Sequence, residues 1–144
     1  MTFFVDANVI IYGATAGPYR ASCLDALASI ARGEADGRTS VAVLEEVWHV
    51  ETSGRAGDLG GLTAHAYALF TPLLPVTDAA LRAALDIAPG TGLGTNDRLH
   101  AGTCRVQGIP VVLSADRAFD ALDDLTRVDP LDPAALRAAL NRPG

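Results

Sequence analysis

Four acidic residues lie where apolar segments of the chain begin or end, although they are far apart in the sequence. They are Asp6, Glu46, Asp97 and Asp116, and 40, 51 and 19 residues separate them. Only tertiary folding can bring them together into one anionic pocket. None of the four positions brings an imidazole or a thiolate with it, and oxygen ligands alone favour a hard cation such as Mg²⁺ or Mn²⁺. The cation would also compensate the repulsion between the carboxylates.

A divalent ion held in this way is suited to the hydrolysis of a phosphodiester. It lowers the pKa of a bound water, orients that water in line with the phosphorus and stabilises the leaving oxygen. We expect Asp6, Asp97 and Asp116 to be the principal ligands, directly or through water. Glu46 would position a water or accept its proton. Each acid alone also has an ordinary structural explanation, as a helix cap, a partner of the helix dipole, a turn residue or part of a solvated helix face.

Strand-like and helix-like segments alternate along the chain and would position these acids. Thr2–Val5 and Ile109–Leu113 are apolar on both faces, as in a parallel sheet covered by helices, and Thr126–Val128 is a further expected strand. Asp6 and Asp116 follow such runs, so both should emerge at the carboxyl edge of the sheet, where ligands bind. We therefore predict an α/β fold with a central, mostly parallel sheet flanked by helices.

The expected helices begin and end at residues that commonly cap helices. Ser40, Thr77 and Thr95 are the expected N-caps, and Gly54 and Gly108 mark expected C-terminal ends. The helices are predicted at residues 19–32, 40–53, 62–74, 78–88 and 95–108, with a short helix after residue 116 and a terminal helix from residue 133. Residues 37–40 would form a turn or a brief strand, and residues 8–12 should belong to the core.

Composition indicates one compact domain over residues 1–144, because 49% of the residues are hydrophobic and 19% are charged. Neither a signal peptide nor a membrane-spanning run is recognisable. The two cysteines, Cys23 and Cys104, are too few for a disulfide framework and suit small buried residues in a reducing cytosol, so we expect a cytoplasmic protein without membrane contact.

All 11 basic residues are arginine, and the absence of lysine argues against P-loop nucleotidases and protein kinases. It also argues against receiver domains and haloacid-dehalogenase-type phosphatases, which ordinarily complete their carboxylate sites with a lysine. The net charge of −6 opposes a polyanionic substrate unless bound metal and nearby arginines compensate. Arg98 and Arg117 directly follow two of the acids and are candidate contacts to substrate phosphates.

The acids occur in four motifs that together cover nearly the whole chain. The motifs are Phe4–Tyr12, Thr39–Glu46, Thr95–Ala101 and Leu113–Asp120. In order and spacing they resemble PIN-domain proteins, and most of all the VapC toxins of bacterial toxin–antitoxin pairs. The resemblance implies a PIN fold and a Mg²⁺-dependent endoribonuclease activity in which Mn²⁺ can replace Mg²⁺, with products that carry a 5′-phosphate and a 3′-hydroxyl. It also implies that the protein forms a homodimer and is inhibited by a small VapB-type antitoxin.

The same resemblance assigns Asp6, Glu46, Asp97 and Asp116 to an acidic quartet that holds the metal. Glu45 competes with Glu46, because neighbouring side chains on a helix point about 100° apart, and counting six residues from Ser40 selects Glu46. Asn8 and Ser114 could orient the carboxylates by hydrogen bonds. Asp120, four residues after Asp116, is an accessory acid in this scheme.

The remaining side chains that attract attention have simpler explanations. His49, His65 and His100 lack the spacing of a zinc site. His100 could approach the site from the helical face of Asp97, but we expect it to be packed or half exposed. Trp48, Tyr67 and Phe70 are expected to pack in the core rather than to stack on bases.

A second hypothesis involves no catalysis. The acidic pocket would then dock an arginine-bearing protein partner, and the protein would be a binding module. An RNA cleavage assay with and without Mn²⁺, followed by addition of antitoxin, separates the two hypotheses. The sequence does not identify the RNA target.

Overall fold

A parallel four-stranded sheet lies at the centre of the computed structural model, which describes residues 1–141. Its strands are β1 (Thr2–Val5), β2 (Asp36–Arg38), β3 (Val111–Leu113) and β4 (Thr126–Val128), in the spatial order β2-β1-β3-β4. All three neighbouring pairs run parallel. The predicted α/β class with a parallel central sheet is therefore confirmed, and β1 and β4 have the predicted bounds.

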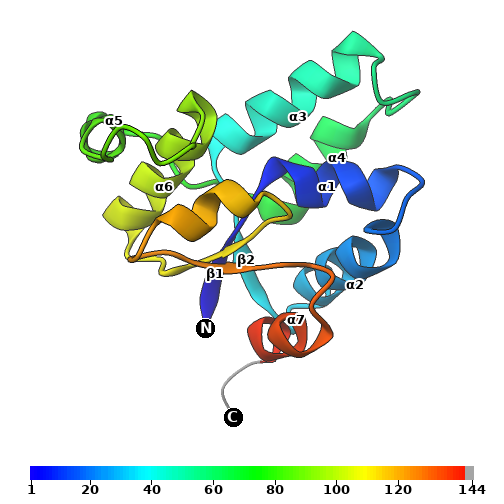
Figure 1. The fold of residues 1–144 in the computed structure, drawn as a ribbon. Helices are drawn as coiled ribbons and strands as arrows, with labels where there is room; N and C mark the ends of the chain where they lie inside the picture. Colours follow the sequence, from blue (N-terminus) through cyan, green and yellow to red (C-terminus); the bar gives the residue numbers. More distant parts are fainter. Residues whose placement is uncertain (142–144) are drawn as a thin grey trace.

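Helices cover both faces of this sheet (Figure 1). They are α1 (Ala7–Ala14), α2 (Arg20–Ala31), α3 (Val41–Ser53), α4 (Leu62–Phe70), α5 (Asp78–Leu85), α6 (Thr95–Gln107), α7 (Pro133–Leu140) and the short 3₁₀ helix η1 (Arg117–Ala121). Helix α1 packs against α2, α3 against α4, and α5 against α6. In the described residues, no helix has both the length and the apolar character that crossing a membrane requires.

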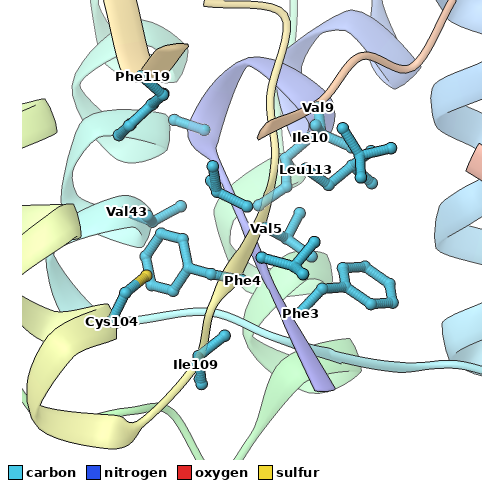
Figure 2. Packing of buried hydrophobic residues seen from close by; sticks show 14 of the residues in the cluster. Phe3, Phe4, Val5, Val9, Ile10, Val43, Cys104, Ile109, Leu113 and Phe119 are labelled. Atoms are coloured by element: carbon cyan, nitrogen blue, oxygen red, sulfur yellow. The ribbon is translucent and has the colours of Figure 1, made fainter. Parts of the chain in front are cut away.

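The core forms around β1, whose residues Phe3, Phe4 and Val5 are completely buried. Successive side chains of a strand point to opposite faces, so Phe4 lies beside Val43 and Cys104 on one face while Phe3 lies on the other (Figure 2). Each such side chain contributes about 1.5–3 kcal/mol when it is removed from water. Both cysteines are buried and free, as the sequence predicted, and burial raises the pKa of the Cys104 thiol to about 12.

Several predicted helix ends are confirmed by their capping hydrogen bonds. The Ser40 hydroxyl accepts from the Val43 amide at 3.2 Å, and α3 ends at Gly54 with a φ of +69° that glycine adopts without strain. The Thr77 hydroxyl accepts from the Ala80 amide at 3.2 Å. Thr95 was wrong as a cap: Gly94 holds that position, and Thr95 is the first residue of α6.

Other predicted bounds were too long. The helix predicted over 62–74 ends at Phe70, because Leu74 leaves the helix and its amide bonds the Thr39 carbonyl at 2.9 Å. The helix predicted to residue 88 ends at Leu85. The third strand starts at Val111 rather than Ile109, because the Ile109 amide still bonds the Cys104 carbonyl in α6 at 2.9 Å. A hydrogen bond between remote residues thus accompanies the end of α4, whereas the bond before β3 is local.

Two predicted core positions are on the surface instead. Trp48 is 60% exposed and Tyr67 is 54% exposed, whereas Phe70 is buried as expected. The two aromatic side chains line an apolar groove between α3 and α4. Within residues 8–12, which form part of α1, Val9 and Ile10 are buried but Tyr12 is exposed. Hydrophobicity alone suggested that these segments are wholly buried, but the structure shows amphipathic helices with one exposed face.

Candidate metal centre

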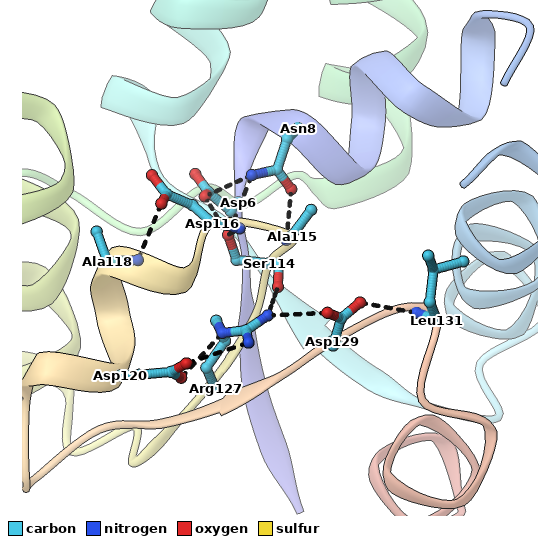
Figure 3. A network of polar contacts seen from close by, with 10 residues as sticks. All are labelled: Asp6, Asn8, Ser114, Ala115, Asp116, Ala118, Asp120, Arg127, Asp129 and Leu131. Carbon is cyan, nitrogen blue, oxygen red and sulfur yellow. Dashed lines mark hydrogen bonds and ion pairs between the residues drawn. The ribbon is translucent and has the colours of Figure 1, made fainter. Parts of the chain in front are cut away.

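The carboxyl ends of β1 and β3, which are neighbours in the sheet, carry the first part of the site. Asp6 follows β1 and caps α1, while Ser114 and Asp116 follow β3. Figure 3 shows Asp6, Asn8, Ser114 and Asp116 together at this edge. Helices α3 and α6 pack on each other and add residues from the side. The crossover topology of the parallel sheet thus brings distant segments to one edge.

Asp6 is buried and held by hydrogen bonds at both carboxylate oxygens. Its Oδ1 accepts from the Ala7 amide at 2.8 Å, and its Oδ2 accepts from the Ser114 hydroxyl at 2.6 Å and the Asn8 amide group at 3.1 Å. Burial raises the pKa of Asp6 above its ordinary value, although the charge of His100 and these hydrogen bonds oppose the rise. The carboxylate is fixed in place and is costly to keep charged without a cation.

Asn8 and Ser114 connect the two strand ends. The Asn8 amide group donates to the Ser114 hydroxyl oxygen at 3.0 Å, and the Asn8 carbonyl oxygen accepts from the Ala115 amide at 3.1 Å. The Asp116 amide also donates to the Ser114 hydroxyl oxygen at 3.0 Å. The hydroxyl therefore accepts two hydrogen bonds and donates one to Asp6, which uses its full capacity. These bonds fix Asp6 and the backbone of Asp116 relative to each other.

Asp97 and Asp116 face each other across the pocket. Burial raises the pKa of Asp97 to about 7, with further contributions from a hydrogen bond to Asp116 and from the charges of Asp6 and Asp116. Asp116 caps η1, because its Oδ1 accepts from the Ala118 amide at 3.0 Å. A carboxyl group whose pKa is raised by burial and by neighbouring acids is one whose ionised form a bound cation would stabilise.

Glu46 is linked to the other acids by its hydrogen bond with His100. The His100 Nε2 lies 2.6 Å from Glu46 Oε1 and 3.9 Å from Asp6 Oδ1, and the imidazole is completely buried. Glu45, by contrast, is exposed on α3. The structure thus turns Glu46 rather than Glu45 towards the pocket.

His100 is the site residue that reasoning from sequence undervalued. It is packed, not half exposed, and its ring contacts Phe4 with the centroids 5.6 Å apart. Burial alone would lower the pKa of His100, but the Glu46 hydrogen bond and the surrounding carboxylates outweigh burial and raise it. Its position three residues after Asp97, on the same face of α6, was the signal for this placement.

The residues present fit a divalent cation. One potential ligand atom from each of Asp6, Asp97 and His100 lies within 4.8 Å of the other two. Burial is the main cause of the raised pKa values of Asp6 and Asp97, and neighbouring acids raise both values further. A cation would offset the cost of ionising these acids, so the electrostatics of the pocket support metal binding.

Of the three other charged residues proposed from the sequence, Arg98 and Asp120 make their contacts outside the acidic cluster. The Arg98 guanidinium donates to the carbonyls of Ile87 at 2.8 Å and Leu93 at 3.2 Å, so it closes the loop before α6. Arg117 is exposed. Asp120 forms a two-pronged ion pair with Arg127, with distances of 2.9 and 3.2 Å. This hydrogen bonding holds the pKa of Asp120 below its ordinary value.

Arg127 itself was not singled out from the sequence. Its side chain is largely buried beneath the loop after β3, where it pairs with Asp120 and Asp129 and donates to the Ser114 carbonyl at 3.1 Å. Figure 3 shows this arrangement. Arg127 supports the backbone that carries Ser114 and Asp116. Sequence reasoning missed this role because two of the three partners, Asp120 and Ser114, lie 7 and 13 residues before Arg127.

Acids gathered at the carboxyl edge of an α/β sheet are an arrangement that could hold a divalent cation. The sequence profile of the PIN domain matches residues 3–125, and the chain belongs to the PIN domain family. No curated protein matches the sequence.

Solved structures with the same fold include the following two. One is VapBC2 from Rickettsia felis bound to a DNA fragment from their promoter, with a TM-score of 0.64, 15% identity and coverage of 89% of this chain and 98% of the other. The other is FitAcB from Neisseria gonorrhoeae, with a TM-score of 0.64, 18% identity and coverage of 92% of this chain and 99% of the other. At these identities the similarity establishes the fold.

Proposed function

We propose that this protein is a Mg²⁺-dependent endoribonuclease of the VapC type, the toxin of a toxin–antitoxin pair. The observation that carries the proposal is the convergence of Asp6, Asp97 and Glu46, with Asp116 opposite Asp97, at the carboxyl edge of a PIN-domain sheet. Helix capping explains Asp6 and Asp116 individually, but it does not explain why acids from four distant segments gather in one partly buried cluster. A cation and a phosphodiester provide a chemical reason.

Each residue has a definite task in this proposal. Asp6, Asp97 and Asp116 hold Mg²⁺, or Mn²⁺ in its place, and Asn8 and Ser114 keep Asp6 oriented. When bound, the ion lowers the pKa of a water and stabilises the leaving oxygen. Glu46 uses Oε1 for His100, and its second oxygen accepts the proton of the attacking water. The water oxygen forms a bond to phosphorus while the P–O3′ bond breaks and O3′ takes up a proton, so cleavage leaves a 5′-phosphate and a 3′-hydroxyl.

The substrate must approach an acidic protein, so cationic groups at the rim matter. Arg117 is exposed beside Asp116 and is the better placed of the two arginines expected to contact phosphate. Arg98 contributes to the rim mainly by fixing the loop before α6. Asp120 acts through Arg127 on the backbone of Ser114.

Antitoxin control belongs to the same proposal. Both structural neighbours are complexes in which a protein of this fold is named together with a second component, VapBC2 and FitAcB. By analogy, a VapB-type antitoxin would place an arginine among the acids and compete with metal and phosphate. We further propose a homodimer that acts in the cytoplasm. If the antitoxin keeps its affinity after all four acids are neutralised, the arginine route is wrong.

The deciding experiment compares RNA cleavage by the wild-type protein, Asp97→Asn and the control Asp123→Asn, which alters an exposed acid before β4. We expect the cleavage rate of Asp97→Asn to be at least about 100-fold lower than that of the wild type. Mutating a residue that only hydrogen-bonds to a metal ligand typically costs about 10- to 100-fold in activity, and removing the ligand itself should cost more. Circular dichroism checks that each variant is folded. An Asp97→Asn protein that cuts RNA at the wild-type rate contradicts the assignment, and a wild-type protein without Mg²⁺- or Mn²⁺-dependent cleavage favours the binding-module hypothesis.

A further inference from the structure

His100 is a buried imidazole that the acidic quartet does not explain. It lies on α6, one turn after Asp97, and it reaches across to Glu46 on α3. It is completely buried, whereas the Glu46 side chain is 23% exposed. The contact therefore joins a rigid group in the core to a carboxylate at the mouth of the pocket.

On the basis of the proposed nuclease function, we propose that His100 is a positioning residue whose Nε2–H group holds the Glu46 carboxylate in the pocket, and that His100 is not itself a metal ligand. The site then keeps an oxygen-only ligand set that suits Mg²⁺. The ligand atoms of Asp6, Asp97 and His100 are close enough for the opposite assignment, so the choice depends on where the imidazole carries its proton.

The two ring nitrogens have different surroundings. Nε2 has the Glu46 oxygen at 2.6 Å, a short distance for a hydrogen bond to a charged acceptor. Nδ1 is buried and has no hydrogen-bond partner among the described residues. A proton on Nδ1 would be an unsatisfied buried donor, whereas a bare Nδ1 leaves only an unused acceptor. The network therefore places a proton on Nε2.

A metal bound at Nε2 would require the reverse arrangement. The imidazole would have to lose the Nε2 proton and carry one on Nδ1, and metal-bound histidines usually donate that second N–H to a carboxylate, a carbonyl or water. His100 Nδ1 has no such acceptor in the described structure. The Glu46 carboxylate would also lose its hydrogen bond. Both effects oppose coordination by His100.

The hydrogen bond has a direct consequence for Glu46. A glutamate on a helix surface has several rotamers, and most of them point into solvent. Because His100 holds Oε1, the side chain is restricted to one orientation, and in this proposal the second oxygen accepts the proton of the attacking water. The Phe4 ring packs against the imidazole and fixes the position of the Nε2–H donor. His100 therefore acts on the reaction through Glu46 and not through the metal.

Three variants separate positioning from ligation. His100→Gln retains an N–H donor near the position of Nε2, His100→Leu removes it, and His65→Leu is a control at an exposed histidine on α4. We expect His100→Leu to lower kcat by roughly 10- to 100-fold with an unchanged KM for RNA, because a misplaced catalytic group costs about that much. His100→Gln should recover most of the loss. Mg²⁺ affinity, measured by calorimetry, should stay within about threefold in both variants.

A second measurement does not depend on activity. In ¹⁵N-labelled wild-type protein, the one-bond ¹H–¹⁵N signal of His100 Nε2 should be present before and after saturation with Mg²⁺, which is diamagnetic. The neutral Nε2–H tautomer and the imidazolium ion both give this signal, so the test reports the proton on Nε2 directly. Loss of the signal on Mg²⁺ addition would show coordination and overturn the inference.

The outcomes also distinguish this inference from the proposed function. A wild-type protein that does not cleave RNA refutes the proposed function, while the NMR signal still decides whether His100 donates from Nε2. With an active wild type, equal kcat values for His100→Leu and the wild type overturn the positioning role. Equal losses of Mg²⁺ affinity in His100→Leu and His100→Gln would identify His100 as a ligand and overturn it as well.

Discussion

Replacing Asp97 by asparagine should stabilise the metal-free protein even though it removes the activity. The folded protein raises the pKa of Asp97 from 3.8 to about 7, through burial, a hydrogen bond to Asp116 and the charges of Asp6 and Asp116. At pH 8, in the absence of metal, the folded state must therefore hold an ionised carboxylate in an unfavourable place. Asparagine has nearly the same shape and no charge.

The size of the effect follows from the pKa. A rise from 3.8 to about 7 corresponds to at most about 4 kcal/mol. Asp97 is only half-buried, and solvent screening reduces the figure to about 1–2 kcal/mol. For a protein of this size, that is a rise in Tm of about 3–6 °C.

The pH dependence has a definite sign. Because the folded state binds the Asp97 proton more tightly than the unfolded state, the contribution of Asp97 to stability falls as pH rises from about 4 to 7 and does not recover above that range. The Asp97→Asn variant lacks this decline. The two proteins should therefore have similar Tm values near pH 4 and differ most above pH 7.

Thermal melts between pH 4 and 8 in EDTA, and again with Mg²⁺, test both parts. At about 100 times Kd, Mg²⁺ adds about 2.7 kcal/mol to the wild type and much less to the variant, so the order of stability should reverse. The exposed Asp123→Asn variant should follow the wild type throughout. An Asp97→Asn variant less stable than the wild type at pH 8 in EDTA would refute the electrostatic reasoning.

Three further perturbations follow from the structure. Gly102→Ala should cost about 1–3 kcal/mol in thermal melts, because a Cβ there would lie 2.2 Å from the Ala80 carbonyl oxygen on α5. A Cβ at Gly94 meets no atom within 4 Å, so Gly94→Ala should cost at most about 1 kcal/mol, from the poorer N-cap. Equal melting temperatures for the two variants would contradict the steric argument. Arg127→Met removes two ion pairs and the hydrogen bond to the Ser114 carbonyl. Urea unfolding should show that the free energy of unfolding falls by about 1–3 kcal/mol, and RNA cleavage should be slower. An unchanged cleavage rate would show that Arg127 does not support the site. EDTA should abolish cleavage and lower Tm, and either Mg²⁺ or Mn²⁺ should restore both; cleavage that persists in EDTA would rule out metal dependence.

Local chemistry made much of the fold readable from the sequence. The apolar run of β1, the hydroxyl cap at Ser40 and the left-handed glycine at Gly54 act over a few residues, and the structure has them as predicted. The end of α4 was misjudged because the decisive hydrogen bond joins Leu74 to Thr39, which is remote in sequence. The exposure of Trp48 was also misjudged, since hydrophobicity does not reveal which face of a helix lacks a neighbour.

The candidate site divides in the same way. The residue types and their order along the chain determined that several carboxylates would follow strands or start helices, and hence that a cation and a phosphodiester were plausible partners. Only the tertiary structure decided that Glu46 rather than Glu45 faces the pocket, that His100 holds it, and that Arg98 and Asp120 are engaged elsewhere. Sequence fixes the periodicity of each element, whereas the packing of α3 on α6 and of β1 beside β3 sets which side chains meet, because those contacts join residues tens of positions apart.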